Sequence, residues 1–198
     1  MHEPASRVPF VGLTGGLGAG KSTALEALAS LGAATLSTDA VVHELLGSSP
    51  VRDALVDRFG TSVAPDGVVD RGAVATQAFG NEEERKWLEG LLWPLVGERV
   101  AEFRASVKDV PAAVVEVPLL FESGMEQGFD HTIAIVADEA VRADRAGARG
   151  HEAVEERAGR QLSQEEKSQR ADFTVRNDGG VDELKAELAE ILESIGSG

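Results

Sequence analysis

The stretch Gly15-Gly-Leu-Gly-Ala-Gly-Lys-Ser22 decides the fold class of this protein. It matches the spacing G-x-x-x-x-G-K-[S/T] in full, and it stands between an apolar run, Val8–Thr14, and a helical pattern, Lys21–Leu31. Glycines let such a loop fold with its backbone N–H groups pointing inward, and the helix that follows adds its positive N-terminal end. Strand, glycine-rich loop, lysine and helix in this order predict a Walker A loop that binds phosphate groups.

The loop residues have separate expected roles toward a nucleoside triphosphate. Lys21 should reach the β- and γ-phosphates, and the hydroxyl of Ser22 should be a ligand of Mg²⁺. The nucleotide-binding residues predicted in this stretch are Gly15, Gly16, Leu17, Gly18, Ala19, Gly20, Lys21, Ser22 and Thr23. A flexible linker and a Rossmann dinucleotide site fit less well, because a lysine at the start of a helix suits a triphosphate. The loop alone does not distinguish a kinase from an ATPase or a switch GTPase.

Short apolar runs alternate with helical patterns along the rest of the chain. Besides Val8–Thr14, we expect strands at Ala34–Leu36, Ala112–Val117, His131–Val136 and Phe173–Val175. We expect a helix capped by Thr38-Asp39 and running through Leu45, and further helices at Pro50–Phe59, at Glu82–Val107, from Asp138 onward and at Val181–Ile195. Pro94 should kink or divide the long helix, and Ser62–Val69 should form a turn or a small hairpin. The alternation predicts an α/β fold of the P-loop NTPase type, a parallel sheet with helices on both faces.

Composition excludes several kinds of site. The chain has 198 residues, of which 42% are hydrophobic and 27% charged, and these values are typical of one globular α/β domain. It has no cysteine, which excludes disulfides, Cys-ligated zinc and a thiol nucleophile. The net charge of −15 argues against nucleic acid or an anionic membrane as a partner. No stretch approaches the ~20 apolar residues of a membrane span, so we expect a cytoplasmic protein.

Two carboxylates follow predicted strands, at the edge of the sheet where ligands bind in this fold class. Asp39 could orient or deprotonate a substrate hydroxyl, or it could only cap the helix that follows. Glu116 stands at the Walker B position, where an acid holds Mg²⁺ directly or through water. The alternative for Glu116 is a solvent-facing residue of an edge strand.

Basic side chains gather in residues 139–170, although the whole chain has only 19 lysines and arginines. They include Arg142, Arg145, Arg149, Arg157, Arg160 and Lys167. Arginine suits bidentate contact with phosphate, and a charged helical segment between two core strands is typical of a lid. The alternative is a solvated helix face, and we expect two or three of these residues to touch a ligand.

Further stretches, taken in order and at their spacing, resemble one known family. They are Val11–Thr23, Thr38–Leu45, Asp70-Arg71, Leu88–Val96, Val117–Glu122, Gln161, Lys167–Asp172 and Asn177–Gly179. The family is dephospho-coenzyme A kinase, and the most specific elements are V-P-L-L-F-E and the closing K-x-x-x-A-D…N-x-G run. The resemblance covers residues 8–195.

The resemblance implies that the γ-phosphate of ATP is transferred to the ribose 3′-hydroxyl of dephospho-coenzyme A, the last step of coenzyme A synthesis. ATP and dephospho-coenzyme A are the implied partners and Mg²⁺ the implied metal. We expect a monomer, with a small homo-oligomer left open. A single P-loop kinase domain, residues 1–198, is implied. Its expected parts are a core at about 8–45, 110–138 and 171–195, a substrate-binding helical insertion at about 46–109 and a lid at about 139–170.

Residue by residue, the resemblance assigns catalytic roles to Asp39, Lys21 and Arg145. Arg142 joins Arg145 as a lid arginine that contacts the nucleotide, and Asn177 and Gly179 lie in the loop beside the adenine. The implied substrate-binding residues are Asp39, Arg71, Leu119 and Glu122, and the implied metal ligands are Ser22 and Glu116.

Three positions depart from the family pattern. Ser37 replaces the first aspartate of D-x-D, Trp93 replaces a histidine, and His43 stands where arginine is frequent. These departures leave a catalytically weak paralogue as one alternative. Another small-molecule P-loop kinase, of the nucleoside or shikimate type, is a second. A nucleotide-dependent switch is a third, although the chain lacks the N-K-x-D motif of GTPases.

Overall fold

The computed structural model describes residues 7–147 and 161–196. It divides into two compact units, here called the core unit and the helical unit. The core unit comprises Met1–Ser37 and Arg104–Gly198, and the helical unit comprises Thr38–Phe103.

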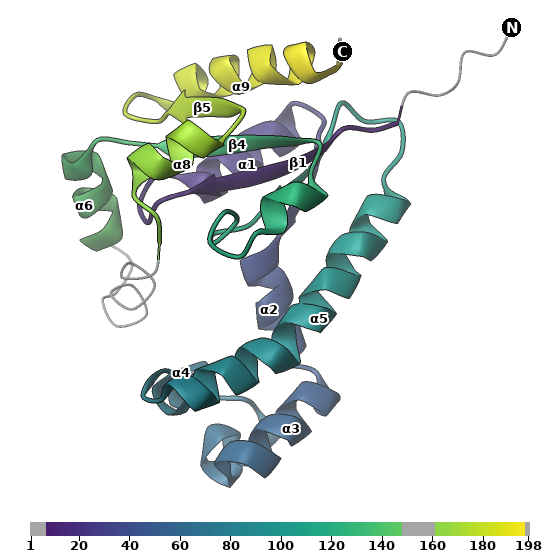
Figure 1. The fold of residues 1–198 in the computed structure, drawn as a ribbon, viewed down its shortest axis with the longest axis vertical. Coiled ribbons are helices and arrows are strands. Elements are labelled where there is room, and N and C mark those ends of the chain that lie inside the picture. The colour runs from purple at the N-terminus through teal and green to yellow at the C-terminus, as the bar shows by residue number, and fades with distance from the viewer. Residues whose placement is uncertain (1–6, 148–160, 197–198) are drawn as a thin grey trace, which may run out of the picture. The chain divides into compact units, whose positions relative to one another are not determined.

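The core unit is built on five parallel strands (Figure 1). They are β1 (Phe10–Gly15), β2 (Ala34–Ser37), β3 (Ala113–Glu116), β4 (His131–Val136) and β5 (Phe173–Arg176), in the order β2-β3-β1-β4-β5. All five expected strands are present, and their ends differ from the expected ones by at most two residues. The predicted parallel α/β sheet is therefore confirmed.

Strand register aligns β1, β2 and β3 near their carboxyl ends. Leu13 of β1 and Ser37 of β2 both pair with Glu116 of β3. Every residue of β1 is buried, because the strand has a neighbour on each side and helices over each face. Such a strand reads as a continuous apolar run rather than an alternating one, which explains why the sequence signal was clear.

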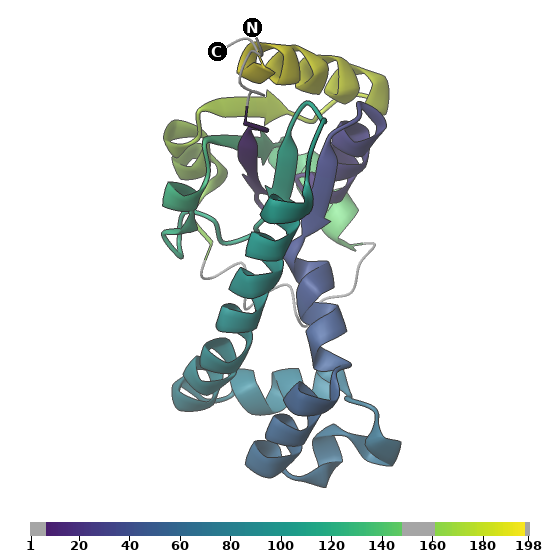
Figure 2. The same ribbon diagram turned by 90° about the vertical axis from the view of Figure 1, so that its right-hand side faces the viewer.

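Helices cover both faces of the sheet. The helices α1 (Lys21–Ser30) and α9 (Val181–Gly196) lie over one face, and α8 (Gln164–Arg170) lies over the other (Figure 2). A buried cluster joins the first face to α1 and α9; it includes Val11, Leu13, Ile133, Ile135, Leu28 and Leu188. On the opposite face Phe10 stacks on Phe129, which follows η3 (Met125–Gly128), with ring centroids 4.6 Å apart. The short helix α6 (Glu139–Gly147) follows β4.

The helical unit has its own apolar core. Its elements are α2 (Thr38–Leu46), α3 (Ser49–Phe59), η1 (Thr61–Val63), η2 (Pro65–Gly67), α4 (Arg71–Phe79) and α5 (Glu82–Ser106), the last of which runs on into the core unit. The buried side chains are Leu46, Val51, Leu55, Val63, Val74, Ala78, Leu88 and Leu92. None of the helices in the described residues is long and apolar enough to cross a membrane.

The structure decides between two pairs of local alternatives, and it adds one helix that was not expected. The helix α5 continues through Pro94 and is not divided. Proline has no N–H group to donate to the carbonyl of Gly90, four residues earlier. Both residues are exposed, so water can bind that carbonyl instead. Of the two alternatives for Ser62–Val69, the turn is confirmed and the hairpin is wrong, because residues 61–67 form two 3₁₀ turns. The helix α4 was not expected, although Asp70 is an N-cap signal in the sequence. In the structure Asp70 Oδ1 accepts from the N–H groups of Gly72 at 2.9 Å and Ala73 at 3.1 Å.

Candidate active site

The predicted P-loop lies between β1 and α1, and its conformation depends on glycine. Gly18 and Gly20 have φ angles of 73° and 93°, which favour glycine. A Cβ on Gly18 would also lie 2.6 Å from the carbonyl oxygen of Arg142. Lys21 Nζ donates to the Gly16 carbonyl at 3.2 Å, so the ammonium group lies over the loop. The backbone is therefore shaped as a phosphate-binding nest with its lysine in place.

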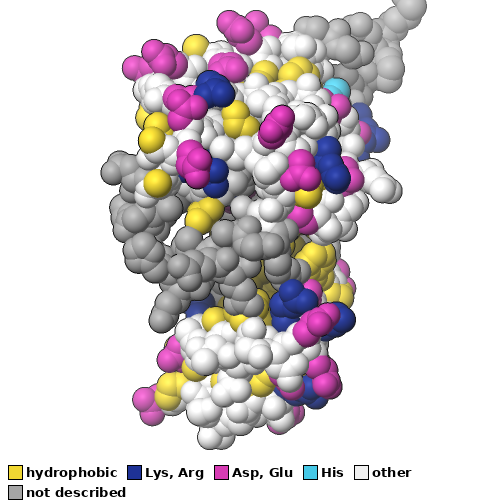
Figure 3. All heavy atoms as spheres, turned by 60° about the vertical axis from the view of Figure 1, so that its left-hand side comes forward, with side chains coloured by type: hydrophobic (Ala, Val, Ile, Leu, Met, Phe, Trp, Pro, Cys, Tyr) yellow, Lys and Arg dark blue, Asp and Glu magenta, His cyan; other side chains and the backbone are white. Residues whose placement is uncertain are grey.

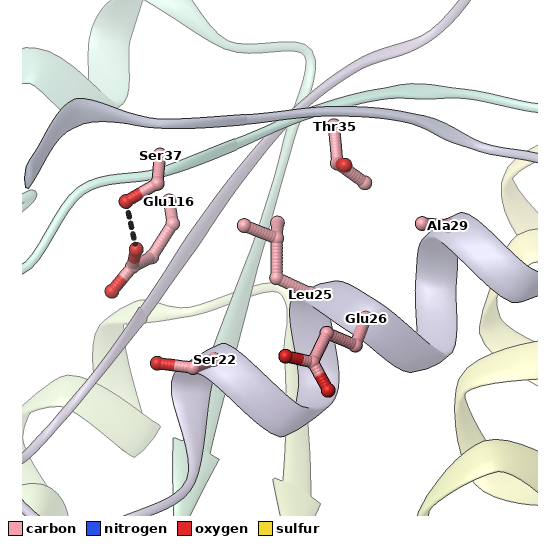
Figure 4. A pocket seen from close by; sticks show the side chains of 7 residues that line it. All are labelled: Ser22, Leu25, Glu26, Ala29, Thr35, Ser37 and Glu116. Carbon is pink, nitrogen blue, oxygen red and sulfur yellow. Dashed lines mark hydrogen bonds between the residues drawn. The ribbon is translucent and has the colours of Figure 1, made fainter. Parts of the chain in front are cut away.

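Ser22 and Glu116 face one cavity of about 210 Å³ (Figure 4). Its lining residues are Ser22, Leu25, Glu26, Ala29, Thr35, Ser37 and Glu116. Glu116 is 6% exposed, and its Oε2 accepts a hydrogen bond from Ser37 Oγ at 2.6 Å. Because β3 lies between β2 and β1, the edge-strand alternative for Glu116 is wrong.

The oxygen atoms of this cavity fit a hard divalent cation. Mg²⁺ prefers oxygen ligands and is usually held by one or two side chains together with water and substrate phosphates. Among the described residues, no group of three or more His, Asp or Glu side chains converges on a metal-sized point. Ser22 and Glu116 would therefore supply only part of the coordination shell, as in a site completed by a nucleotide.

Three residues from distant segments contact the P-loop or one another beside it. Arg142 Nε donates to the Leu17 carbonyl at 2.8 Å, and Asn177 Nδ2 donates to the Ala19 carbonyl at 2.9 Å. Arg145 Nη1 donates to the Asn177 carbonyl at 3.0 Å. A second cavity of about 120 Å³ lies here, lined by Gly18, Gly20, Thr23, Arg145, Asn177, Gly179 and Val181. The structure thus brings together the expected lid arginines of α6, the loop after β5 and the P-loop.

Gln164, which no sequence pattern indicated, fixes the start of α8 to the end of β4. Its Oε1 accepts from the Ala137 N–H at 2.9 Å, and its Nε2 donates to the Ala137 carbonyl at 2.8 Å. The start of α8 is further fixed by a capping box between Ser163 and Glu166. The capping pattern could have been read from the sequence, but the partner of Gln164 lies 27 residues away.

Two residues near the expected ligand set are engaged elsewhere. Lys167, which the sequence places with the phosphate-contacting basic residues, is fully buried and pairs with Glu122. Glu122 Oε1 lies 2.9 Å from Lys167 Nζ and also accepts from the Leu162 N–H at 2.8 Å. We therefore do not keep Glu122 among the substrate contacts. Leu119 is half-buried in the same turn. Arg149, Arg157 and Arg160 lie outside the described residues.

The helical unit holds the two expected acceptor-side residues. Asp39 is exposed in the first turn of α2. Because α2 begins at Thr38, Asp39 is not the N-cap, and the capping alternative is wrong in that form. Arg71 is exposed at the start of α4, and its Nη1 lies 2.6 Å from His43 Nδ1. His43, one of the departures from the family pattern, thus contacts an expected substrate residue.

Comparison with known proteins identifies the family. The model of the dephospho-CoA kinase family matches residues 9–183. A dephospho-CoA kinase from Protochlamydia amoebophila is 36% identical over 193 residues, which cover 93% of this chain and 95% of that protein. A dephospho-CoA kinase from Chromobacterium violaceum is 37% identical over 188 residues, covering 91% of each chain.

A solved structure shares the fold over nearly the whole chain. The crystal structure of TT1252 from Thermus thermophilus superposes with a TM-score of 0.79 at 30% identity, covering 96% of this chain and 98% of that one. The resemblance inferred from the motifs is therefore confirmed over most of the chain. The site has a P-loop with its lysine and serine, and a buried acid at the end of β3. Together with these matches, it shows that the chain belongs to the dephospho-CoA kinase family of P-loop kinases.

Proposed function

We propose that this protein transfers the γ-phosphate of ATP to the ribose 3′-hydroxyl of dephospho-coenzyme A, giving coenzyme A and ADP. The observation that carries the proposal is the juxtaposition of Ser22 and Glu116 beside a formed P-loop, in a chain of this family. The 3′-oxygen bonds to the γ-phosphorus, the bond from phosphorus to the β,γ-bridging oxygen breaks, and ADP leaves.

The chain's own residues supply positioning and charge, which are the main requirements of phosphoryl transfer. Lys21 and the loop N–H groups neutralise the charge on the β- and γ-phosphates. Arg142 and Arg145 approach the same phosphates from α6. Asp39 accepts the proton of the 3′-hydroxyl, and Arg71 binds the acceptor. Asn177 and Gly179 border the adenine.

Mg²⁺ would be held by Ser22 and, directly or through water, by Glu116. When bound it would neutralise phosphate charge and fix the orientation of the triphosphate. Ser37 replaces a family aspartate, and its hydroxyl donates to Glu116. The serine therefore holds the Glu116 carboxylate in one orientation, a role that does not require a second carboxylate.

We further propose that the helical unit binds the acceptor and that residues 139–170 cover the bound nucleotide. Only α6 and α8 of that segment, together with residues 161–163, lie within the described residues. We place the reaction in the cytoplasm, where ATP is available, and propose that the chain acts as a monomer.

Turnover with a set of acceptors tests the proposed reaction. ADP release is measured with Mg²⁺-ATP and dephospho-coenzyme A, a dephospho-pantetheine analogue or adenosine. Rapid release is expected only with dephospho-coenzyme A. Equal turnover with adenosine would indicate another small-molecule kinase, and no turnover with any acceptor would indicate a catalytically weak paralogue.

A further inference from the structure

Lys167 is a buried cation that the proposed mechanism does not use. It is the only buried lysine or arginine among the described residues, and its side chain is 0% exposed. Burial lowers the pKa of its ammonium group, and the carboxylate of Glu122 partly opposes that shift. A charge in such a position is costly unless it is paired and fully hydrogen-bonded.

The three donors of the Lys167 ammonium reach three separate partners. Nζ donates to the Pro118 carbonyl at 2.7 Å, to Glu122 Oε1 at 2.9 Å and to Thr14 Oγ1 at 3.3 Å. Thr14 Oγ1 in turn donates to the same Pro118 carbonyl at 3.3 Å. Since an ammonium group has three donors, its capacity is used in full.

These partners belong to the parts of the core unit that carry the phosphate site. Thr14 directly precedes the P-loop glycine Gly15, and Pro118 lies two residues after Glu116. Glu122 also holds the Leu162 N–H, just before the cap of α8. One ammonium group thus joins the base of the P-loop, the segment after β3 and the start of α8.

Stability alone explains this arrangement poorly. A buried ion pair is weak evidence for stabilisation, because apolar side chains of similar volume often serve as well or better. The second carboxylate oxygen of Glu122, Oε2, is buried and has no hydrogen-bond partner among the described residues. The hydrogen bonds of the pair therefore do not fully offset the free-energy cost of removing both charges from water.

We propose that Lys167 and Glu122 are positioning residues, which hold the P-loop and the Glu116 strand end in the relative geometry that phosphoryl transfer requires. The inference rests on the proposed function for its main readout. Neither side chain touches the phosphates; each acts through Thr14, Pro118 and the backbone that follows them.

The test compares Lys167→Met, Glu122→Gln and the double variant carrying both changes. Either single change should lower kcat by about 10- to 100-fold, the range found when partners one shell away from a site are removed. The KM for ATP should change much less, because alignment is lost rather than binding. The double variant leaves no unpaired buried charge, so its Tm should recover toward that of the wild type while kcat stays low.

Two control variants separate positioning from general damage. Arg170→Met removes a charge from the exposed side of the same helix and should leave kcat and Tm nearly unchanged. Leu192→Ala weakens the buried face of α9 and should lower Tm while kcat, measured well below Tm, is retained. Full recovery of kcat in the double variant would overturn the proposal, since the pair would then be only structural.

A wild type that turns over no acceptor would contradict the proposed function and not this inference. The positioning role would then be read from the affinity for a non-hydrolysable ATP analogue and from slow ATP hydrolysis in the same variants. Loss of hydrolysis with retained affinity would support positioning. Hydrolysis equal to that of the wild type in all three variants would contradict it. If Lys167→Met fails to fold, Glu122→Gln and the double variant give the same decision.

Discussion

At the scale of single residues, Lys21 is the side chain whose role is most direct. Its ammonium group lies over the Gly16 carbonyl, at the position where phosphates would bind. Lys21→Ala should lower kcat by at least ~10²-fold, because one preorganised charge opposite the transferred group is lost. Steady-state kinetics with Mg²⁺-ATP and dephospho-coenzyme A would measure this, and near-normal turnover would contradict the P-loop assignment.

Asp39 is the residue for which chemistry and stability make different predictions. Because it lies in the first turn of α2, where a carboxylate interacts favourably with the helix dipole, Asp39→Asn should lower stability by no more than about 1 kcal/mol. If the carboxylate accepts the hydroxyl proton, kcat should fall far more than the KM for ATP rises. Kinetics and thermal denaturation of the same variant provide both values. Retained kcat would remove Asp39 from the mechanism.

Lys167 should give the protein a distinctive pH dependence of stability. Burial lowers the pKa of Lys167 in the folded state below its unfolded value of about 10.4. The unfolded chain therefore binds more protons in the window between the two pKa values, and the free energy of unfolding rises as pH rises through that window. Denaturant unfolding from neutral pH to about pH 10 should show this rise in the wild type and a flatter curve in Lys167→Met. Lys86→Met is the control, because Lys86 is exposed. Its curve of unfolding free energy against pH shows the effect of removing a lysine that is not buried.

At the scale of elements, α6 matters because it presents two arginines, one turn apart, to the proposed nucleotide site. Arg142 contacts the P-loop carbonyl of Leu17, and Arg145 contacts the Asn177 carbonyl. Arg145→Ala should reduce kcat, whereas Arg170→Ala on α8 should be nearly silent because that side chain is exposed. Hydrogen exchange of residues 139–147 should slow when an ATP analogue and the acceptor are both bound. Equal protection with and without ligands would show that α6 is a fixed part of the core.

At the scale of the whole molecule, the described residues form two hydrophobic clusters that have no residue in common. Leu55→Ala in the helical unit and Leu188→Ala in the core unit are matched changes, since both side chains are 0% exposed. Each should cost about 2–5 kcal/mol of unfolding free energy. Hydrogen exchange should rise mainly in the unit that carries the change. A uniform rise across both units would show that they unfold as one cooperative body.

Net charge also acts at this scale. The protein carries −15, and the face in Figure 3 shows acidic and basic side chains intermixed rather than a broad basic patch. Several of the basic side chains are paired with carboxylates, such as Arg58 with Glu84 and Arg176 with Asp178. Binding of the polyanionic substrates proposed here therefore depends on short-range contacts within the site.

Local patterns in the sequence were sufficient for the sheet, the P-loop and the family. Strands buried on both faces read as apolar runs, and a loop that folds around phosphate needs glycines at set positions. The spacing of the loop predicted Lys21 and Ser22, and the end of an apolar strand predicted Glu116. The helix α4 could also have been predicted, because Asp70 is an N-cap signal next to the residues that it serves.

Only the tertiary structure determined the burial and pairing of residues whose partners lie far away in the sequence. A lysine in a charged helical stretch reads as solvent-exposed, yet packing places Lys167 at 0% exposure beside Thr14, which lies 153 positions away. Gln164 is an ordinary polar residue until it meets the backbone of Ala137. The burial of Glu116 follows from strand order, which places β3 inside the sheet although β3 is far from β1 in the sequence. The physical reason is common to the three cases: burial and pairing belong to the contacts between segments, and single-sequence patterns record only the neighbours along the chain.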